Sequence, residues 1–180
     1  MKTNMKTRQK GATLVVALLM LLVLTVLGLA SMQVTRLEER MAGNSRDVNL
    51  AFQGAEAGLR DAEERIRTYT EATVPVSCAA APCTVWQINV LPQDLRDQTS
   101  AWWVSNATEY GVAGTQELTE VTRDPLVVVE DLDFVADSLT GPTAYSCKPG
   151  RNFYRVTSDS NGASNTAEVV LESTFVQRYC

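Results

Sequence analysis

The chain has a mainly hydrophobic stretch from Gly11 to Thr35 that contains no charged residue. Charged residues become frequent after this stretch. Positions 12–32 read ATLVVALLMLLVLTVLGLASM. A helix of that length extends about 31 Å, which matches the roughly 30 Å hydrocarbon core of a bilayer. The stretch is preceded by four basic residues, Lys2, Lys6, Arg8 and Lys10. Their excess on this side predicts that the N-terminus stays in the cytoplasm and that the rest of the chain is exported.

This N-terminus has two simpler interpretations. One is a secretory signal peptide cleaved near Gly28-Leu29-Ala30, and the other is a permanent single-span anchor. The apolar stretch is longer than the core of a usual signal peptide, which has about 7 to 15 residues. Its length therefore argues against the first interpretation.

A second pattern, with helical spacing, follows the apolar stretch. Steps of four and three residues separate Val48, Phe52, Ala55, Leu59, Ala62, Ile66 and Tyr69. Such spacing is typical of one apolar face of a helix. The alanines in it suit close packing against a sheet better than the seam of a coiled-coil dimer, which is the alternative. We expect one helix over 12–67, with a kink or unwound turn at Gly28 or at Gly43-Asn44.

Beyond residue 70 the pattern changes to short runs of strand-forming residues. Val85–Leu91 and Leu126–Val129 are strand candidates, each bounded by a proline. A hairpin is predicted from Phe153–Ser158 and Ala167–Val176, because Asn-Gly lies in the polar connection between them. Trp102-Trp103 is a buried pair or a binding anchor. An antiparallel sheet beside a long helix gives an α+β fold.

All four cysteines, Cys78, Cys83, Cys147 and Cys180, follow the apolar stretch. This placement is expected where disulfides persist, outside the cytoplasm. Four cysteines allow three connectivities. Proximity along the chain favours Cys78–Cys83, which leaves Cys147–Cys180. A metal site built from four thiolates is the alternative, and the pairs lack the CxxC spacing that it needs.

Composition narrows the classes of function. The 180 residues contain no histidine, the usual general base near neutral pH and the commonest ligand of zinc, copper and non-haem iron. The net charge of -5 argues against a nucleic-acid partner. Glu130, Asp131 and Asp133 could act as an acid and base pair, and a solvated strand end explains them as well. We predict no catalytic, cofactor or metal site.

Two segments carry a resemblance to a known family. Positions 10–32, KGATLVVALLMLLVLTVLGLASM, resemble the N-terminus of a type IV prepilin, in which a short basic leader ends in glycine and an apolar helix follows directly. Positions 36–63, RLEERMAGNSRDVNLAFQGAEAGLRDAE, are similar to the N-terminal region of the PilX minor pilin family. Together they cover about the first third of the chain.

This resemblance implies a lollipop-like α+β pilin. Its parts would be a leader peptide over 1–11, a transmembrane and filament-core helix over 12–35, an amphipathic helix over 36–69 and a periplasmic head with two disulfides over 70–180. The resemblance also implies that prepilin peptidase cleaves between Gly11 and Ala12 and methylates the new amine of Ala12.

Two positions depart from the general pilin pattern. Typical pilins begin the mature chain with Phe and carry Glu at its fifth position, whereas this chain has Ala12 and Val16. In pilins the glutamate pairs with the N-terminal amine of a subunit already in the filament, because an unpaired carboxylate in the bilayer is costly. Val16 therefore favours a priming subunit at or near the filament tip. Drift at a lipid-facing position is the alternative.

The implied function is that of a minor pilin of the type IV pilus, with roles in adhesion and twitching motility. The chain would lie in the inner membrane before assembly and in the extracellular pilus afterwards. Implied partners are prepilin peptidase, the inner-membrane assembly platform, the lipid bilayer, the major pilin, other minor pilins and a tip adhesin. A GspK-like pseudopilin of a type II secretion system is the alternative.

Overall fold

The computed structural model describes residues 12–70, 73–111, 114–137 and 150–178. The leader peptide predicted over 1–11 lies outside these residues, as do Cys147 and Cys180. The chain divides into two compact units, residues 1–44 and residues 45–180. Each unit is described by itself.

Helix α1, Ala12–Thr68, contributes residues to both units. The helix is continuous through Gly28, Gly43 and Asn44, so the predicted unwound turn is wrong, and the predicted kink stays a prediction. A Cβ added at either glycine would meet no atom within 4 Å. The helix includes both glycines, although each stabilises it by about 1 kcal/mol less than alanine would.

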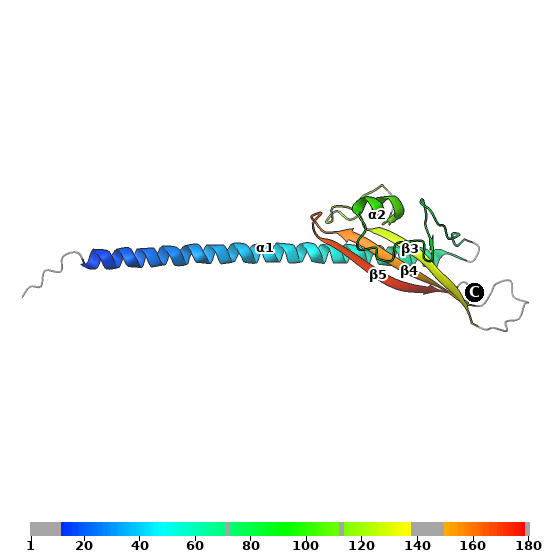
Figure 1. Ribbon diagram of the computed structural model, residues 1–180, viewed down its shortest axis with the longest axis horizontal. Helices are drawn as coiled ribbons and strands as arrows, with labels where there is room; N and C mark the ends of the chain where they lie inside the picture. The colour runs from blue at the N-terminus through cyan, green and yellow to red at the C-terminus, as the bar shows by residue number, and fades with distance from the viewer. Residues whose placement is uncertain (1–11, 71–72, 112–113, 138–149, 179–180) are drawn as a thin grey trace, which may run out of the picture. The chain divides into compact units, whose positions relative to one another are not determined.

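The second unit is built on one mixed sheet. Its strands are β1 (Trp86–Gln87), β2 (Thr108–Glu109), β3 (Leu126–Ala136), β4 (Gly150–Asn161) and β5 (Glu168–Gln177). The order is β1-β3-β4-β5, and β2 pairs with the beginning of β3. Strands β3, β4 and β5 are antiparallel neighbours, as Figure 1 shows, whereas β1 runs parallel to β3. The predicted α+β class is confirmed.

Two predicted strands differ from the observed ones in length. The candidate Val85–Leu91 contains only the two residues of β1, because Asn89 adopts a left-handed conformation with φ of 63° and turns the chain. The candidate Leu126–Val129 is the beginning of β3, which continues to Ala136. Its later residues are polar or exposed, so the sequence pattern did not mark them as a strand.

The predicted hairpin is confirmed in β4 and β5, where Tyr154 pairs with Phe175. The connection between the strands begins at Gly162, whose N–H donates to the carbonyl oxygen of Ala167 at 2.8 Å. This turn lies against α1, since a Cβ at Gly162 would clash with Asp47. The Asp47 carboxylate accepts hydrogen bonds from the N–H of Ser164 at 3.1 Å and from its hydroxyl, and these bonds lower the pKa of Asp47.

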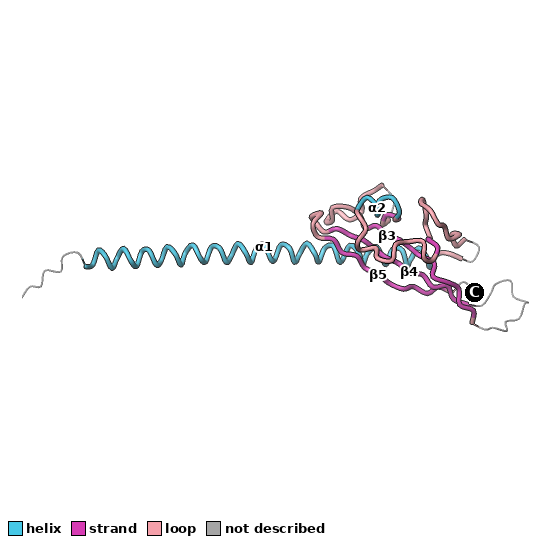
Figure 2. The backbone as a smooth tube through the Cα atoms, viewed as in Figure 1, coloured by secondary structure: helices cyan, strands magenta, loops and turns pink. Residues whose placement is uncertain are grey.

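The sheet is covered on both faces. Successive strand residues point to opposite sides, and the two sides contribute to two apolar clusters. The cluster on the α1 side contains Ala62, Ile66, Val85, Val127, Val129, Tyr154 and Val156. The opposite cluster contains Trp86, Leu91, Leu95, Trp103, Leu126 and Val128. Figure 2 shows the short helix α2, Ser100–Asn106, and the loops that carry most of this second layer.

The face that α1 turns toward the sheet consists mainly of small residues. Its buried positions are Ala51, Gly54, Ala55, Gly58, Ala62 and Ile66. Val48 and Phe52 belonged to the predicted apolar face but are 50% and 43% exposed. At Gly58 an added Cβ would lie 3.0 Å from Cβ of Pro125 and 3.1 Å from Cγ2 of Val127. The glycines thus allow the helix backbone to approach the sheet closely.

Candidate functional site

Residues 12–35 form an apolar helical surface. Large apolar side chains are exposed all along it, from Leu14 at 65% to Val34 at 54%. An 18-residue window of α1 has a mean hydropathy of 2.8, and none of that window is buried within the protein. The helix is therefore long and apolar enough to cross a membrane.

Three hydroxyl side chains within this surface are hydrogen-bonded to the helix backbone. The hydroxyls of Thr25, Ser31 and Thr35 donate to carbonyl oxygens three or four residues earlier, at distances of 2.8, 3.0 and 3.2 Å. This pattern lets hydroxyl residues enter a lipid environment, where unsatisfied polar groups are costly. Beside them, Gly28 has no neighbouring group within 4 Å. The small residues at 28, 30 and 31 leave room for a second helix to approach.

The predicted processing residues lie at the beginning of this helix. α1 begins at Ala12, and Val16 is 55% exposed one turn later. Gly11 lies outside the described residues. Cleavage at Gly11, methylation of Ala12 and the role of Val16 stay predictions.

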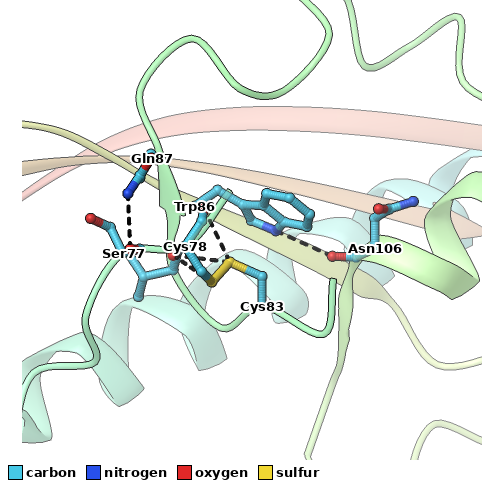
Figure 3. The surroundings of a disulfide bond; sticks show 7 residues. Ser77, Cys78, Cys83, Trp86, Gln87 and Asn106 are labelled. Atoms are coloured by element: carbon cyan, nitrogen blue, oxygen red, sulfur yellow. Dashed lines mark hydrogen bonds between the residues drawn. A yellow bond between two sulfur atoms is a disulfide. The ribbon is translucent and has the colours of Figure 1, made fainter. Parts of the chain in front are cut away.

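A disulfide joins Cys78 and Cys83 next to β1. Cys78 also extends the sheet, because its N–H donates to the carbonyl of Val85 and its carbonyl accepts from the N–H of Gln87, both at 3.0 Å. Figure 3 shows the bridge beside the indole of Trp86, whose Nε1 donates to the carbonyl of Asn106 at 3.3 Å. The disulfide thus holds in place the segment around Cys78, whose backbone is hydrogen-bonded beside β1. The second predicted bridge, Cys147–Cys180, lies outside the described residues.

Removing this bridge is expected to destabilise the second compact unit, residues 45–180, which we call the head from here on. For a short closed loop, the chain-entropy model gives about 2 kcal/mol. We predict that the double variant Cys78→Ser/Cys83→Ser lowers the free energy of unfolding by that amount in urea titrations. Tryptophan fluorescence is a suitable signal, since Trp86 is 4% exposed. An unchanged unfolding midpoint would contradict the prediction, and the exposed Ser105→Ala change on α2 is the control.

The carboxylates that suggested an acid and base pair are not equivalent. Glu130 is 2% exposed and accepts a hydrogen bond from Nε of Arg155 at 2.8 Å, a second from Nη2 of the same guanidinium, and a third from the N–H of Asn89 at 2.9 Å. It is a structural ion-pair residue. Asp131 is partly buried and Asp133 is exposed. Burial and the neighbouring charge of Asp133 raise the pKa of Asp131.

A second buried ion pair was missed from the sequence. Asp159 on β4 is fully buried and pairs with Arg123. Burial raises the pKa of Asp159 to about 7, Arg123 opposes this shift, and Glu168 adds to it. No pattern in the sequence marks Asp159 as buried, since it lies in a run of polar residues that the sheet and α1 enclose.

The tryptophan pair is part of the core. Trp103 on α2 is fully buried, Trp102 is partly buried, and the two rings meet edge to face with centroids 5.4 Å apart. The hydroxyl of Thr99 caps the helix by accepting from the N–H of Trp102 at 3.3 Å. The pair therefore fills the layer opposite α1, and the alternative of an exposed binding anchor is wrong for Trp103.

Among the described residues, no cluster of three or more His, Cys, Asp or Glu side chains is suited to hold a metal ion. Two family models match the chain: the PilX N-terminal model matches residues 10–60, and the model of the C-terminal part of the type IV pilus assembly protein PilX matches residues 56–177. The comparisons with curated proteins and with solved structures gave no match.

Proposed function

Because the chain belongs to the PilX family of type IV pilus assembly proteins, we propose that it is a minor pilin that lies at or near the filament tip and primes pilus assembly. The observation that carries the proposal is the helical surface of residues 12–35, which contains no charged residue. Its large apolar side chains are exposed, and Val16 stands where pilins carry glutamate. Such a surface suits contact with lipid before assembly and contact with neighbouring helices within the filament.

Assembly on this proposal exchanges contacts between helix and lipid for contacts between helices. Lipid tails are as apolar as leucine, so packing drives the exchange more than hydrophobic transfer does. The small residues at 28, 30 and 31 support this exchange, since a Cβ added at Gly28 would meet no other described residue within 4 Å. The partners in this role are the inner-membrane platform, other minor pilins and the major pilin. The head supplies the contacts that distinguish one partner from another.

The first test is the N-terminus of the processed protein. We expect N-terminal sequencing and intact mass to show a chain that begins at Ala12, because prepilin peptidase removes residues 1–11. A Gly11→Leu variant places a bulky side chain at the scissile bond and should keep its leader. A wild-type protein that retains residues 1–11, or that begins near residue 31, would contradict the proposal.

The second test concerns the tip position. A first subunit has no predecessor whose amine could pair with a carboxylate. An unpaired charge costs about 3 kcal/mol at the centre of a membrane helix and less toward its end, where position 16 lies. We therefore expect Val16→Glu to reduce the number of pili in electron micrographs and to reduce twitching. Val16→Leu is the matched control and should leave both unchanged. Normal piliation by Val16→Glu would remove the argument for the tip.

One alternative remains specific enough to test. A GspK-like pseudopilin of a type II secretion system would also lack the glutamate at position 16. Deleting the gene and assaying both twitching and protein secretion separates the two machines. Loss of twitching with normal secretion supports the pilus, and the reverse result supports the secretion system.

A further inference from the structure

Among the described residues, the outer edge of strand β3 has no neighbouring strand over its second half. On its inner side it pairs with β4 as far as Ala136. On its outer side, within the described part of the chain, β2 covers residues 126–127 and β1 covers residues 130–131. β1 stops there because the chain turns at Asn89, whose N–H donates to Glu130. The backbone of Leu132–Ala136 thus faces away from β4 without a described neighbouring strand.

An open groove of about 450 Å³ lies beside this edge. The groove is lined by Asp131, Leu132, Asp133 and Phe134 of β3, by Gln87 and Ile88 at the end of β1, by Ser77, and by Asn152 of the neighbouring strand β4. Ile88 and Phe134 are 49% and 39% exposed, so the groove has apolar walls in contact with solvent. An exposed strand edge with apolar neighbours is a template for pairing with another chain.

The groove carries negative charge that the described residues do not neutralise. The other acids near it have cations: Glu130 pairs with Arg155, and Asp137 pairs with Arg151 and Arg178. No basic side chain of the described residues pairs with Asp131 or Asp133. Oδ1 of Asp131 is buried and has no hydrogen-bond partner among these residues. A cation entering the groove would meet two adjacent carboxylates.

We propose that the outer edge of Leu132–Ala136 binds an extended segment of a partner protein that carries a lysine or arginine. The segment adds a strand to β3, its apolar side chains contact Ile88 and Phe134, and its cation pairs with Asp131 and Asp133. The N–H of Phe134 now donates to Oδ1 of Asp133 at 2.7 Å, so an incoming carbonyl exchanges one acceptor for another. Backbone pairing of this kind gives affinity, and the charge gives specificity.

The test uses the full chain in detergent micelles and a fluorescent seven-residue peptide of alternating lysine and valine. We expect saturable binding in fluorescence anisotropy, and about tenfold weaker binding to Asp131→Asn/Asp133→Asn, because two charge-assisted contacts are lost. Asp97→Asn/Glu172→Gln removes the same charge from exposed positions elsewhere in the head and should bind like the wild type. Near-UV circular dichroism establishes that each variant is folded, and Asp133→Asn alone, at an exposed position, gives a milder second measurement.

Three results would overturn the proposal. Equal binding of a glutamate and valine peptide would show that the carboxylates do not select the ligand. Equal binding of a basic peptide with methylated backbone nitrogens would exclude strand addition. Binding that appears only after Lys148→Ala would show that the chain's own segment 138–149 occupies the groove. Each result concerns the head alone, so none of them depends on the filament position proposed above.

Discussion

Arg155→Met is expected to lower the free energy of unfolding of the head by about 3 kcal/mol, because it leaves a buried carboxylate without its cation. Glu130 is 2% exposed, and Arg155 supplies two of its hydrogen bonds. We place the effect at the low end for buried pairs, since the Arg155 side chain is 32% exposed and water reaches the guanidinium. Methionine keeps the length of the aliphatic stem, so the loss reports the charge more than the packing. Urea unfolding measured by tryptophan fluorescence gives the value.

The matched control for this change is Arg60→Met on α1. Arg60 and Glu56 form an ion pair in which the two side chains are 80% and 42% exposed, and such surface pairs contribute about 0 to 1 kcal/mol. Adding Glu130→Gln to Arg155→Met should recover part of the loss, because the uncompensated charge is removed. Equal effects of Arg60→Met and Arg155→Met would contradict a structural role for the buried pair.

Gly58→Val is expected to destabilise the head by about 3 kcal/mol, because α1 can no longer approach the sheet. The added Cβ would overlap the hydroxyl of Ser158 and press on Pro125 and Val127. Overpacking a filled core costs about 1 to 3 kcal/mol, and the branched side chain has no free rotamer between helix and sheet. Thermal unfolding followed by far-UV circular dichroism measures the change.

Gly43→Ala tests the replacement of a helix glycine where space is free. Nothing lies within 4 Å of a Cβ at Gly43, so alanine should only improve helix propensity, by about 1 kcal/mol. A comparable loss of stability in both glycine variants would mean that backbone conformation, and not the contact with the sheet, explains the requirement at position 58.

Local patterns predicted the elements of this fold better than the contacts between them. Charge-free length identified the apolar N-terminal helix, and the Asn161-Gly162 pair identified the hairpin, because both signals are contained within a short segment. The helix face was only partly predicted. Gly54 and Gly58 carry no hydrophobic signal, yet they are buried, since their value lies in the absence of a side chain.

The buried ion pairs could not be predicted for a related reason. Glu130 and Arg155 are 25 residues apart, and Arg123 and Asp159 are 36 apart. Each charge looks like an ordinary surface residue in the sequence, until strand register places Glu130 opposite Arg155 and the loop before β3 brings Arg123 to Asp159. The turn at Asn89 is another case: an apolar run predicted a longer strand, whereas the hydrogen bond from Asn89 to Glu130 ends β1 early. The edge of β3 without a described neighbouring strand follows from that early end.

The bond between Asp47 and Ser164 joins residues 117 positions apart. A ribosome makes Asp47 long before it makes Ser164, so the first helical turns of the head wait for their anchor until most of the polypeptide exists. Contacts of such long range close late in folding. A chain interrupted before the final hairpin would therefore carry a complete N-terminal helix and a head that lacks this contact.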